Sequence, residues 1–171
     1  MGAYSLEDLL TYHEVDMFLK KEAEILDSGD FESWLALLED EVRIQVPVRL
    51  TREKGALSDT SGSMEYMLED KETLRLRIER LKSEYAWAED PPSRIKHVIV
   101  NLMVDANDGE RIHARYVIII LRSRGESTET DLLFGRRSDI LKKTPNGLKL
   151  VNRVTVLDHS VLGTKNLSFF I

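Results

Sequence analysis

The pattern of apolar positions predicts two helices at the start of the chain. Ser5 and Asp8 have the spacing of an N-terminal capping box, and Gly29 supplies a stop for the first helix. Asp30 can then cap a second, shorter helix. Each helix carries apolar side chains on one face, so we expect the pair to cover a sheet. These side chains are Val15, Phe18, Leu19, Ala23 and Leu26 in the first helix and Trp34, Leu35, Leu37 and Leu38 in the second.

A half-buried strand is expected next. From Val42 to Leu50 apolar and polar residues alternate strictly, which is the period of a strand with one buried face. Pro47 lies within this stretch and has no N–H to donate. We therefore expect the strand to lie at a sheet edge or to contain a bulge.

A long loop and a third helix should follow the strand. Residues 51–63 are rich in Ser, Thr, Gly and charge and show no period, so they are either a partner-binding loop or a surface loop without a role. Asp70 is expected to cap the third helix, which must end before Pro91-Pro92. Its apolar face would be made by Leu74, Ile78, Leu81 and Tyr85.

The second half of the chain is predicted to be almost entirely strand. Turn residues at Asn107-Asp108-Gly109, Gly125 and Pro145-Asn146-Gly147 separate four extended segments. Short turns between successive strands give an antiparallel meander, and the whole order gives an α+β domain with the helices on one face of a curved sheet. The expected strands are 95–104, 111–124, 128–143 and 148–157.

Chain length and hydropathy limit the number of domains, the possible membrane spans and the cellular location. With 171 residues the chain suits one domain spanning 1–171. The longest purely apolar run, Tyr116–Leu121, is far shorter than the roughly 20 residues that cross a bilayer, so we expect no membrane span. Glu7 and Asp8 stand where a secretory signal would place basic residues, which favours the cytoplasm.

Charge and cysteine content exclude several functions. A net charge of −6 argues against nucleic-acid binding, which depends on clustered Lys and Arg. The chain has no cysteine, so it can form no disulfide, thiolate zinc site or cysteine-ligated iron–sulfur cluster. Any redox chemistry associated with this protein must therefore take place on another chain.

Histidines are the first candidates for metal chemistry, since two histidines and a carboxylate can hold iron. The hairpin around Asn107-Asp108 would set His97 opposite about residue 118 and His113 opposite about residue 102, with the rings roughly 15 Å apart at the usual strand rise. This separation argues against a shared metal site. His97 remains the best candidate for an acid or base inside a cone formed by sheet and helices; the alternative is that it bonds locally or faces solvent.

Motifs for other ligands are missing. Asp105–Gly109 is similar to the start of a calcium loop, but its glycine comes one position early, so we expect a turn. No G-x-G-x-x-G, P-loop or G-x-S-x-G motif occurs, which leaves nucleotide binding and serine-hydrolase chemistry without support.

Two tracts are unusual for a monomer and are candidates for contacts between subunits. The segment Trp87–Arg94 combines an aromatic, acids, two prolines and an arginine; alternatively Trp87 joins the core and Asp90 pairs with Arg94. The last residues are apolar, and exposing them would forgo roughly 1.5 to 3 kcal/mol each, so they should pack against their own domain or a neighbouring subunit. The candidate interface residues are Trp87, Asp90, Pro91, Pro92, Arg94, Arg136, Arg137, Phe169 and Phe170.

Three stretches resemble the beta subunits of Rieske-type aromatic-ring-hydroxylating dioxygenases. The first runs from Glu22 to Leu38 and is similar to the family's opening helix pair. The second is Trp87–Arg94, followed closely by His97. The third begins at Gly135-Arg136-Arg137 and continues to Phe170. The resemblance runs along nearly the whole chain, and these three stretches come in the expected order.

The resemblance implies a cystatin-like, NTF2-like α+β fold and an assembly of alpha and beta subunits, commonly three of each. It implies that the alpha subunit carries a Rieske [2Fe-2S] cluster and a mononuclear non-haem Fe(II). Electrons would come from NADH through a reductase, often with a ferredoxin, and oxygen would add to an aromatic ring as a cis-dihydrodiol. No catalytic, cofactor-binding or metal-binding residue of this chain follows from the resemblance.

Two other classes stay open. The same fold serves dehydratases and isomerases that act alone with a His or Asp inside the cone, and it also serves binding modules with no enzymatic partner. A scaffold should have its cone filled by apolar side chains, whereas an isomerase should have an open pocket with perturbed acids or bases. A bare binding module should associate with no iron protein.

Overall fold

The computed structural model describes residues 4–51, 53, 59–82, 92–164, 166–167 and 169–171. Within these residues three helices and six strands follow one another along the chain. The helices are α1 (Leu6–Ser28), α2 (Phe31–Ala36) and α3 (Lys71–Lys82). The strands are β1 (Leu38–Arg49), β2 (Thr60–Asp70), β3 (Arg94–Asn107), β4 (Arg111–Ser123), β5 (Thr130–Thr144) and β6 (Gly147–Leu157).

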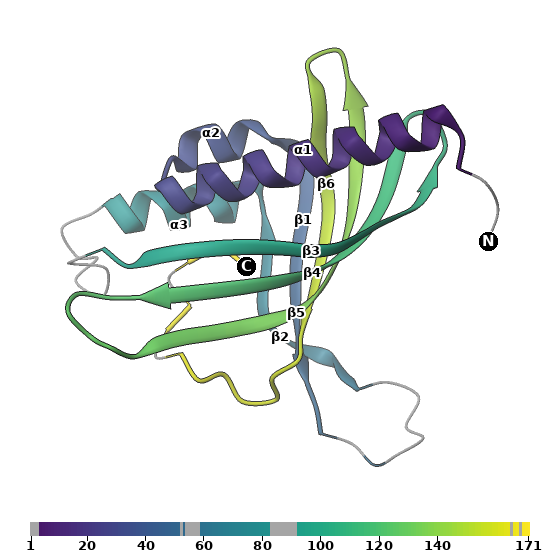
Figure 1. The fold of residues 1–171 in the computed structure, drawn as a ribbon. Coiled ribbons are helices and arrows are strands. Elements are labelled where there is room, and N and C mark those ends of the chain that lie inside the picture. The colour runs from purple at the N-terminus through teal and green to yellow at the C-terminus, as the bar shows by residue number, and fades with distance from the viewer. Residues whose placement is uncertain (1–3, 52, 54–58, 83–91, 165, 168) are drawn as a thin grey trace.

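The strands form a single sheet in the order β2-β1-β6-β5-β4-β3. All neighbours pair antiparallel except β1 and β6, which run parallel. Figure 1 shows the helices gathered on one side of the strongly twisted sheet, with α1 lying across it. The expected α+β class, with a mostly antiparallel curved sheet and helices on one face, is confirmed.

The core lies between the helices and this face of the sheet. Every second residue of β4 from Ile112 to Ile120 is buried and meets the apolar stripe of α1, which includes Val15 and Leu19. The predicted helix ends are also confirmed. Ser5 and Asp8 form a reciprocal capping box, and Gly29 closes α1 with a positive φ of 74°.

One strand was not predicted. β2 includes residues 60–63, which the sequence placed in a loop, and extends to Asp70. Its burial has no period of two, because β2 is an edge strand covered only in part by α3. The loop prediction is therefore wrong for 60–63. β1 also begins at Leu38, four residues before the expected start.

The bulge expected at Pro47 is confirmed. β1 is paired on both sides, with β2 and with β6, so Pro47 does not lie in an edge strand. Instead the register with β2 shifts on each side of Pro47, which relieves the missing N–H.

Candidate functional site

A cluster of charged side chains lies inside the core, between α1 and the sheet. The Arg153 guanidinium donates to both oxygens of Glu22 at 2.8 and 2.7 Å. It also donates to both oxygens of Asp139 at 2.9 and 2.7 Å, because Asp139 and Arg153 are cross-strand partners on β5 and β6. All three residues are 1–2% exposed. One arginine thus joins two carboxylates that come from different layers of the fold.

Neutral donors complete the cluster. Trp34 Nε1 donates to Glu22 at 3.0 Å, and Tyr116 Oη donates to Asp139 at 2.8 Å. Burial alone would raise the pKa of Glu22, but the charge and hydrogen bonds of Arg153 outweigh it and hold that pKa at about 2. Burial raises the pKa of the Tyr116 phenol. These shifts keep the carboxylate charged and the phenol protonated around neutral pH, so neither group is ready for proton transfer.

Arg137 belongs to the same interior surface. It lies between Tyr116 and Thr155 in the sheet register and is 2% exposed. Its Nε and Nη2, like Thr155 Oγ1, have no hydrogen-bond partner among the described residues. The sequence had proposed Arg137 as an interface residue. The alternation of β5 turns Arg137 inward and Arg136 outward. The interface role of Arg137 stays a prediction.

His97 binds the segment that contains Phe170 and, together with Asp27, lines a pocket of about 370 Å³. Its Nδ1 lies 2.8 Å from Asp27 Oδ1, and its Nε2 lies 3.0 Å from the carbonyl oxygen of Phe170. Burial raises the pKa of Asp27, but the hydrogen bonds from His97 and Lys96 lower that pKa by more. The pKa of Asp27 therefore lies below its ordinary value. The alternative that His97 bonds locally is therefore confirmed.

The apolar tail packs into its own core. Phe169, Phe170 and Ile171 are 3–4% exposed, and the Phe170 ring lies 4.6 Å from the ring of Trp34. Arg77 on α3 donates to the carbonyl oxygens of Leu167 and Phe169. Of the two packing sites expected for the tail, the structure shows its own domain. The interface role proposed for Phe169 and Phe170 stays a prediction, with little of either side chain exposed in the single chain.

The remaining interface candidates fall into two groups. Trp87, Asp90 and Pro91 lie outside the described residues. Pro92, Arg94 and Arg136 are exposed, and Arg94 donates to the Gly125 carbonyl oxygen at 2.7 Å. Their role at an interface stays a prediction.

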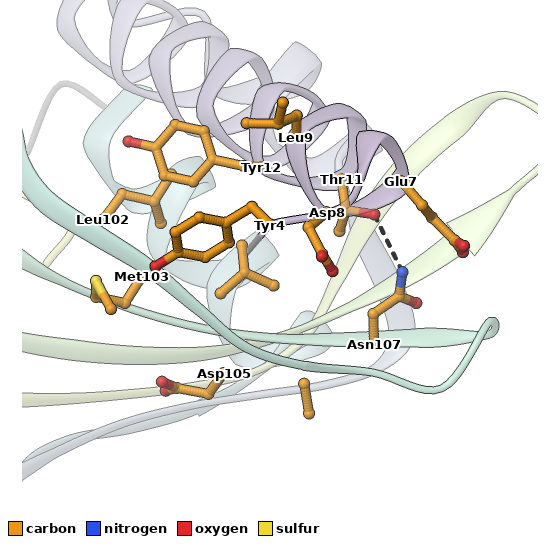
Figure 2. A pocket seen from close by; sticks show the side chains of 12 residues that line it. Tyr4, Glu7, Asp8, Leu9, Thr11, Tyr12, Leu102, Met103, Asp105 and Asn107 are labelled. Carbon is orange, nitrogen blue, oxygen red and sulfur yellow. Dashed lines mark hydrogen bonds between the residues drawn. The ribbon is translucent and has the colours of Figure 1, made fainter. Parts of the chain in front are cut away.

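A groove of about 610 Å³ lies on the surface between the first turns of α1 and β3. Figure 2 shows Tyr4 and Tyr12 on its helix side and Met103 and Asn107 on its strand side. Its one marked hydrogen bond joins Asn107 Nδ2 to Thr11 Oγ1 at 3.1 Å. The groove lies outside the charged cluster and brings no histidine to its carboxylates.

The two histidines of the β3–β4 hairpin lie far apart. His97 pairs with Ile120 and His113 with Ala106, so the two histidines are seven residues apart along β4. Their separation is confirmed, although bulges in β3 shift the expected register by two to four residues. Within the described ranges no group of three or more metal-ligating side chains occurs, and no helix is long and apolar enough to span a membrane.

The sequence did carry a signal for the cluster that was missed. Glu22 lies on the buried stripe of α1, between Leu19 and Leu26. Arg137 and Asp139 take the inward positions of β5 between Leu133 and Leu141. A charge in register with a buried apolar face indicates a buried ion pair, since such a charge needs a partner. The expectation of a wholly apolar cone is corrected accordingly.

Comparison with known proteins adds the family. Residues 21–164 match the family model described as the ring hydroxylating beta subunit. The chain belongs to this family. Two relatives of the ring hydroxylating beta subunit family are the biphenyl 2,3-dioxygenase subunit beta of Rhodococcus jostii and the benzene 1,2-dioxygenase subunit beta of Pseudomonas putida. They are 35% and 33% identical to this chain, and each alignment covers 92% of this chain and 87% of the relative.

Solved structures place the fold. A naphthalene 1,2-dioxygenase chain, solved with indole bound in the active site, aligns with a TM-score of 0.80 at 26% identity over 98% of this beta subunit and 95% of that chain. A putative scytalone dehydratase from Novosphingobium aromaticivorans aligns with a TM-score of 0.65 at 12% identity over 89% of this chain and 87% of its own. The second likeness concerns the fold alone. The expected NTF2-like fold and the expected family are both confirmed.

Proposed function

We propose that this beta subunit is a structural, non-catalytic component of an aromatic-ring-hydroxylating dioxygenase. The observation that carries the proposal is the interior of the cone. Where a dehydratase of this fold would need an acid or base facing substrate, Arg153 binds Glu22 and Asp139 through four hydrogen bonds. Such a cluster favours a packed core over a reaction site.

The dehydratase or isomerase alternative needs a His and an Asp that face a ligand. His97 and Asp27 have that chemistry and line a pocket of about 370 Å³. The two side chains bond to each other, however, and the second ring nitrogen of His97 is taken by the carbonyl oxygen of Phe170. The alternative of a bare binding module is weakened by the family match, because the matched relatives are named as subunits of dioxygenases.

The catalytic groups belong, in this proposal, to the alpha subunit. A Rieske [2Fe-2S] cluster requires cysteine ligands, and this chain has none. The mononuclear Fe(II) would also lie on the alpha subunit, where dioxygen would add to the aromatic ring. NADH would supply electrons through a reductase, with or without a separate ferredoxin. We further propose three alpha and three beta subunits in the complex, a single domain over residues 1–171 of the beta chain, and a place in the cytoplasm.

The test is the mass and iron content of the complex that co-purifies with a tagged copy of this chain expressed beside the alpha subunit. The expected result is an iron-containing hetero-oligomer with equal numbers of the two chains and ring-hydroxylating activity. The same chain expressed alone is the control and should contain no iron. An iron-free assembly made of this chain alone would overturn the proposal.

A further inference from the structure

The pocket of about 370 Å³ that His97 and Asp27 line has walls from separate parts of the fold. It lies where α1 finishes and β3 begins, next to α2, α3 and the tail (Figure 1). Ligand pockets measure about 300 to 1,000 Å³ and are mostly apolar, so this one suits a small molecule of one or two fused rings. Its apolar wall is made by Leu26, Phe31, Leu81, Ile95, Phe169 and Phe170.

The apolar wall is rich in aromatic rings. Phe31 and Phe170 meet edge to face, with ring centroids 5.2 Å apart. Trp34 lies behind Phe170, with ring centroids 4.6 Å apart. Aromatic rings gain from edge-to-face or offset contacts at such separations, in addition to the area that they bury. A flat aromatic ligand would extend this cluster, so the wall favours an arene over an aliphatic molecule of the same size.

The polar side of the pocket is dominated by Asp27. It is the one carboxylate among the described residues that line the pocket. Its Oδ1 accepts from the backbone N–H of His97 at 3.0 Å and lies 2.8 Å from the ring Nδ1. Its Oδ2 accepts from Lys96 Nζ at 3.2 Å, and the Lys96 side chain is 71% exposed. Each carboxylate oxygen has two lone pairs, so Oδ2 can accept a further hydrogen bond from a ligand.

The charges around Asp27 restrict the ligand to a neutral donor. A ligand carboxylate would be repelled by the Asp27 carboxylate. A ligand ammonium would meet Lys96, which is already paired with Asp27. It would also meet Arg77, whose guanidinium carbon lies 5.0 Å from the centre of the Phe170 ring. A hydroxyl group is neutral and donates a hydrogen bond, so it satisfies both conditions.

We propose that this pocket binds a neutral arene of one or two fused rings that bears a hydroxyl group. The rings pack against Phe31 and Phe170, and the hydroxyl donates to Asp27 Oδ2. His97 is a positioning residue, since it bonds both to Asp27 and to the carbonyl oxygen of Phe170. The inference goes beyond the proposed function, because the site needs neither an alpha subunit nor iron.

The first test compares three probes on one ring system by NMR titration of the full-length chain at pH 7. The probes are 1-naphthol, 1-methoxynaphthalene and 1-naphthoate, which carry a neutral donor, a neutral group that cannot donate, and an anion. A hydrogen bond to a charged group corresponds to about a tenfold gain in affinity or more, so 1-naphthol should bind at least about tenfold more tightly than either other probe. Equal affinities for the three probes would overturn the inference.

Leu81→Trp tests whether the probe occupies this pocket. Leu81 is half-buried in the last turn of α3, so the chain should accept the larger side chain, which would fill the space left for a ligand. We expect 1-naphthol to bind at least about tenfold more weakly. Leu76→Trp, at a 59% exposed position of α3 outside the pocket, should bind 1-naphthol like the wild-type chain. Circular dichroism checks the fold of both variants, and unchanged binding in Leu81→Trp would exclude this pocket as the site.

Asp27→Asn tests the charge of the polar side. The amide removes the negative charge, keeps an acceptor and adds a donor. We expect the preference for 1-naphthol over 1-naphthoate to fall by about tenfold, a change that a purely apolar site would not show. Asp16→Asn, an exchange elsewhere on α1 in a residue paired with Lys20, should keep the wild-type preference. The same preference in Asp27→Asn and in the wild-type chain would contradict the role of Asp27.

Contacts in the unaltered chain give a test that does not depend on the folding of any variant. Intermolecular NOEs are expected between the ring protons of 1-naphthol and the methyl groups of Ile95 and Leu81, which line the pocket. Leu76, outside the pocket, should show none. NOEs to Leu76 in place of Ile95 and Leu81, or no NOE to any of the three, would refute the proposed site.

Discussion

Arg153 illustrates how individual residues of this protein stabilise the interior at a cost. Taking one arginine and two carboxylates out of water is unfavourable, and their mutual attraction offsets this only with good geometry and further hydrogen bonds. Here Trp34 and Tyr116 provide those bonds. Loss of one carboxylate would remove two of the four hydrogen bonds that Arg153 donates to Glu22 and Asp139.

Glu22→Gln tests this balance through pH. The pKa of Glu22 is about 2 in the folded chain against an ordinary 4.5, so the carboxylate contributes stability above pH 4.5 that is lost as the pH falls towards 2. At about 1.4 kcal/mol per pH unit the difference corresponds to about 3 kcal/mol. We expect Glu22→Gln to lose about that much at pH 7 and to show a flatter pH dependence below 4.5 in urea unfolding. Glu24→Gln, which changes an exposed neighbour, is the control; an unchanged pH slope in Glu22→Gln would contradict the prediction.

Gly135 is required by the close approach of two strands. A Cβ at this position would lie 2.2 Å from the carbonyl oxygen of Val156, which is backbone and cannot move aside cheaply. We expect Gly135→Ala to cost about 3 kcal/mol or more in urea unfolding. Gly62→Ala, where a Cβ meets nothing within 4 Å, should unfold at nearly the wild-type midpoint. Equal midpoints for the two variants would refute this role of Gly135.

Among the elements, the sequence was informative where one face is buried. The caps of α1 and the alternation in β1 follow directly from local chemistry, so they were predicted. β2 was missed because an edge strand with mixed exposure leaves no period to detect. The inward position of Arg137 could have been predicted from the alternation of β5, but its neighbours could not. Those neighbours, like the packing site of the tail, depend on contacts between distant parts of the chain.

The tail serves as an element of the core although it is neither helix nor strand. Removal of residues 169–171 would expose a cavity against Trp34 and release the carbonyl partners of Arg77 and His97. At roughly 1.5 to 3 kcal/mol per buried side chain, the loss approaches the whole stability of a typical domain. We expect the truncated chain to fail to fold, which circular dichroism would show as a loss of secondary structure.

Milder changes keep that prediction testable. Phe170→Leu should fold and lose about 1 to 3 kcal/mol in urea unfolding, since it removes ring contacts but keeps the site apolar. Val161→Ser, in an 82% exposed position of the same segment, should change stability little. A truncated chain with wild-type unfolding would show that the tail does not stabilise the core.

At the scale of the whole molecule, the side of the sheet that packs on the helices is covered. The other side of the sheet and the outer face of α1 carry exposed apolar side chains. The fold class and the family could be predicted because they depend on the order of elements and on motifs spread along the chain. The surfaces that contact other subunits could not be predicted from the sequence. Exposed apolar side chains leave no distinct pattern in a sequence where buried ones dominate.

Oxidative footprinting should reveal the covered surfaces. In the isolated chain Met17 and Met103 should react with hydroxyl radicals, as their exposed fractions of 51% and 45% allow. In the assembled complex both should be protected severalfold. Met64, 53% exposed on β2, is expected to react in both states, and buried Met67 in neither. Full reactivity of Met17 and Met103 in the complex would count against both surfaces as contacts.

The burial of Phe169, Phe170 and Ile171 has a consequence for biosynthesis. Phe170 packs between Trp34 and Arg77, which come far earlier in the chain. The core therefore cannot close until the ribosome has released residues 169–171. Until then the apolar residues of the sheet stay accessible to other chains.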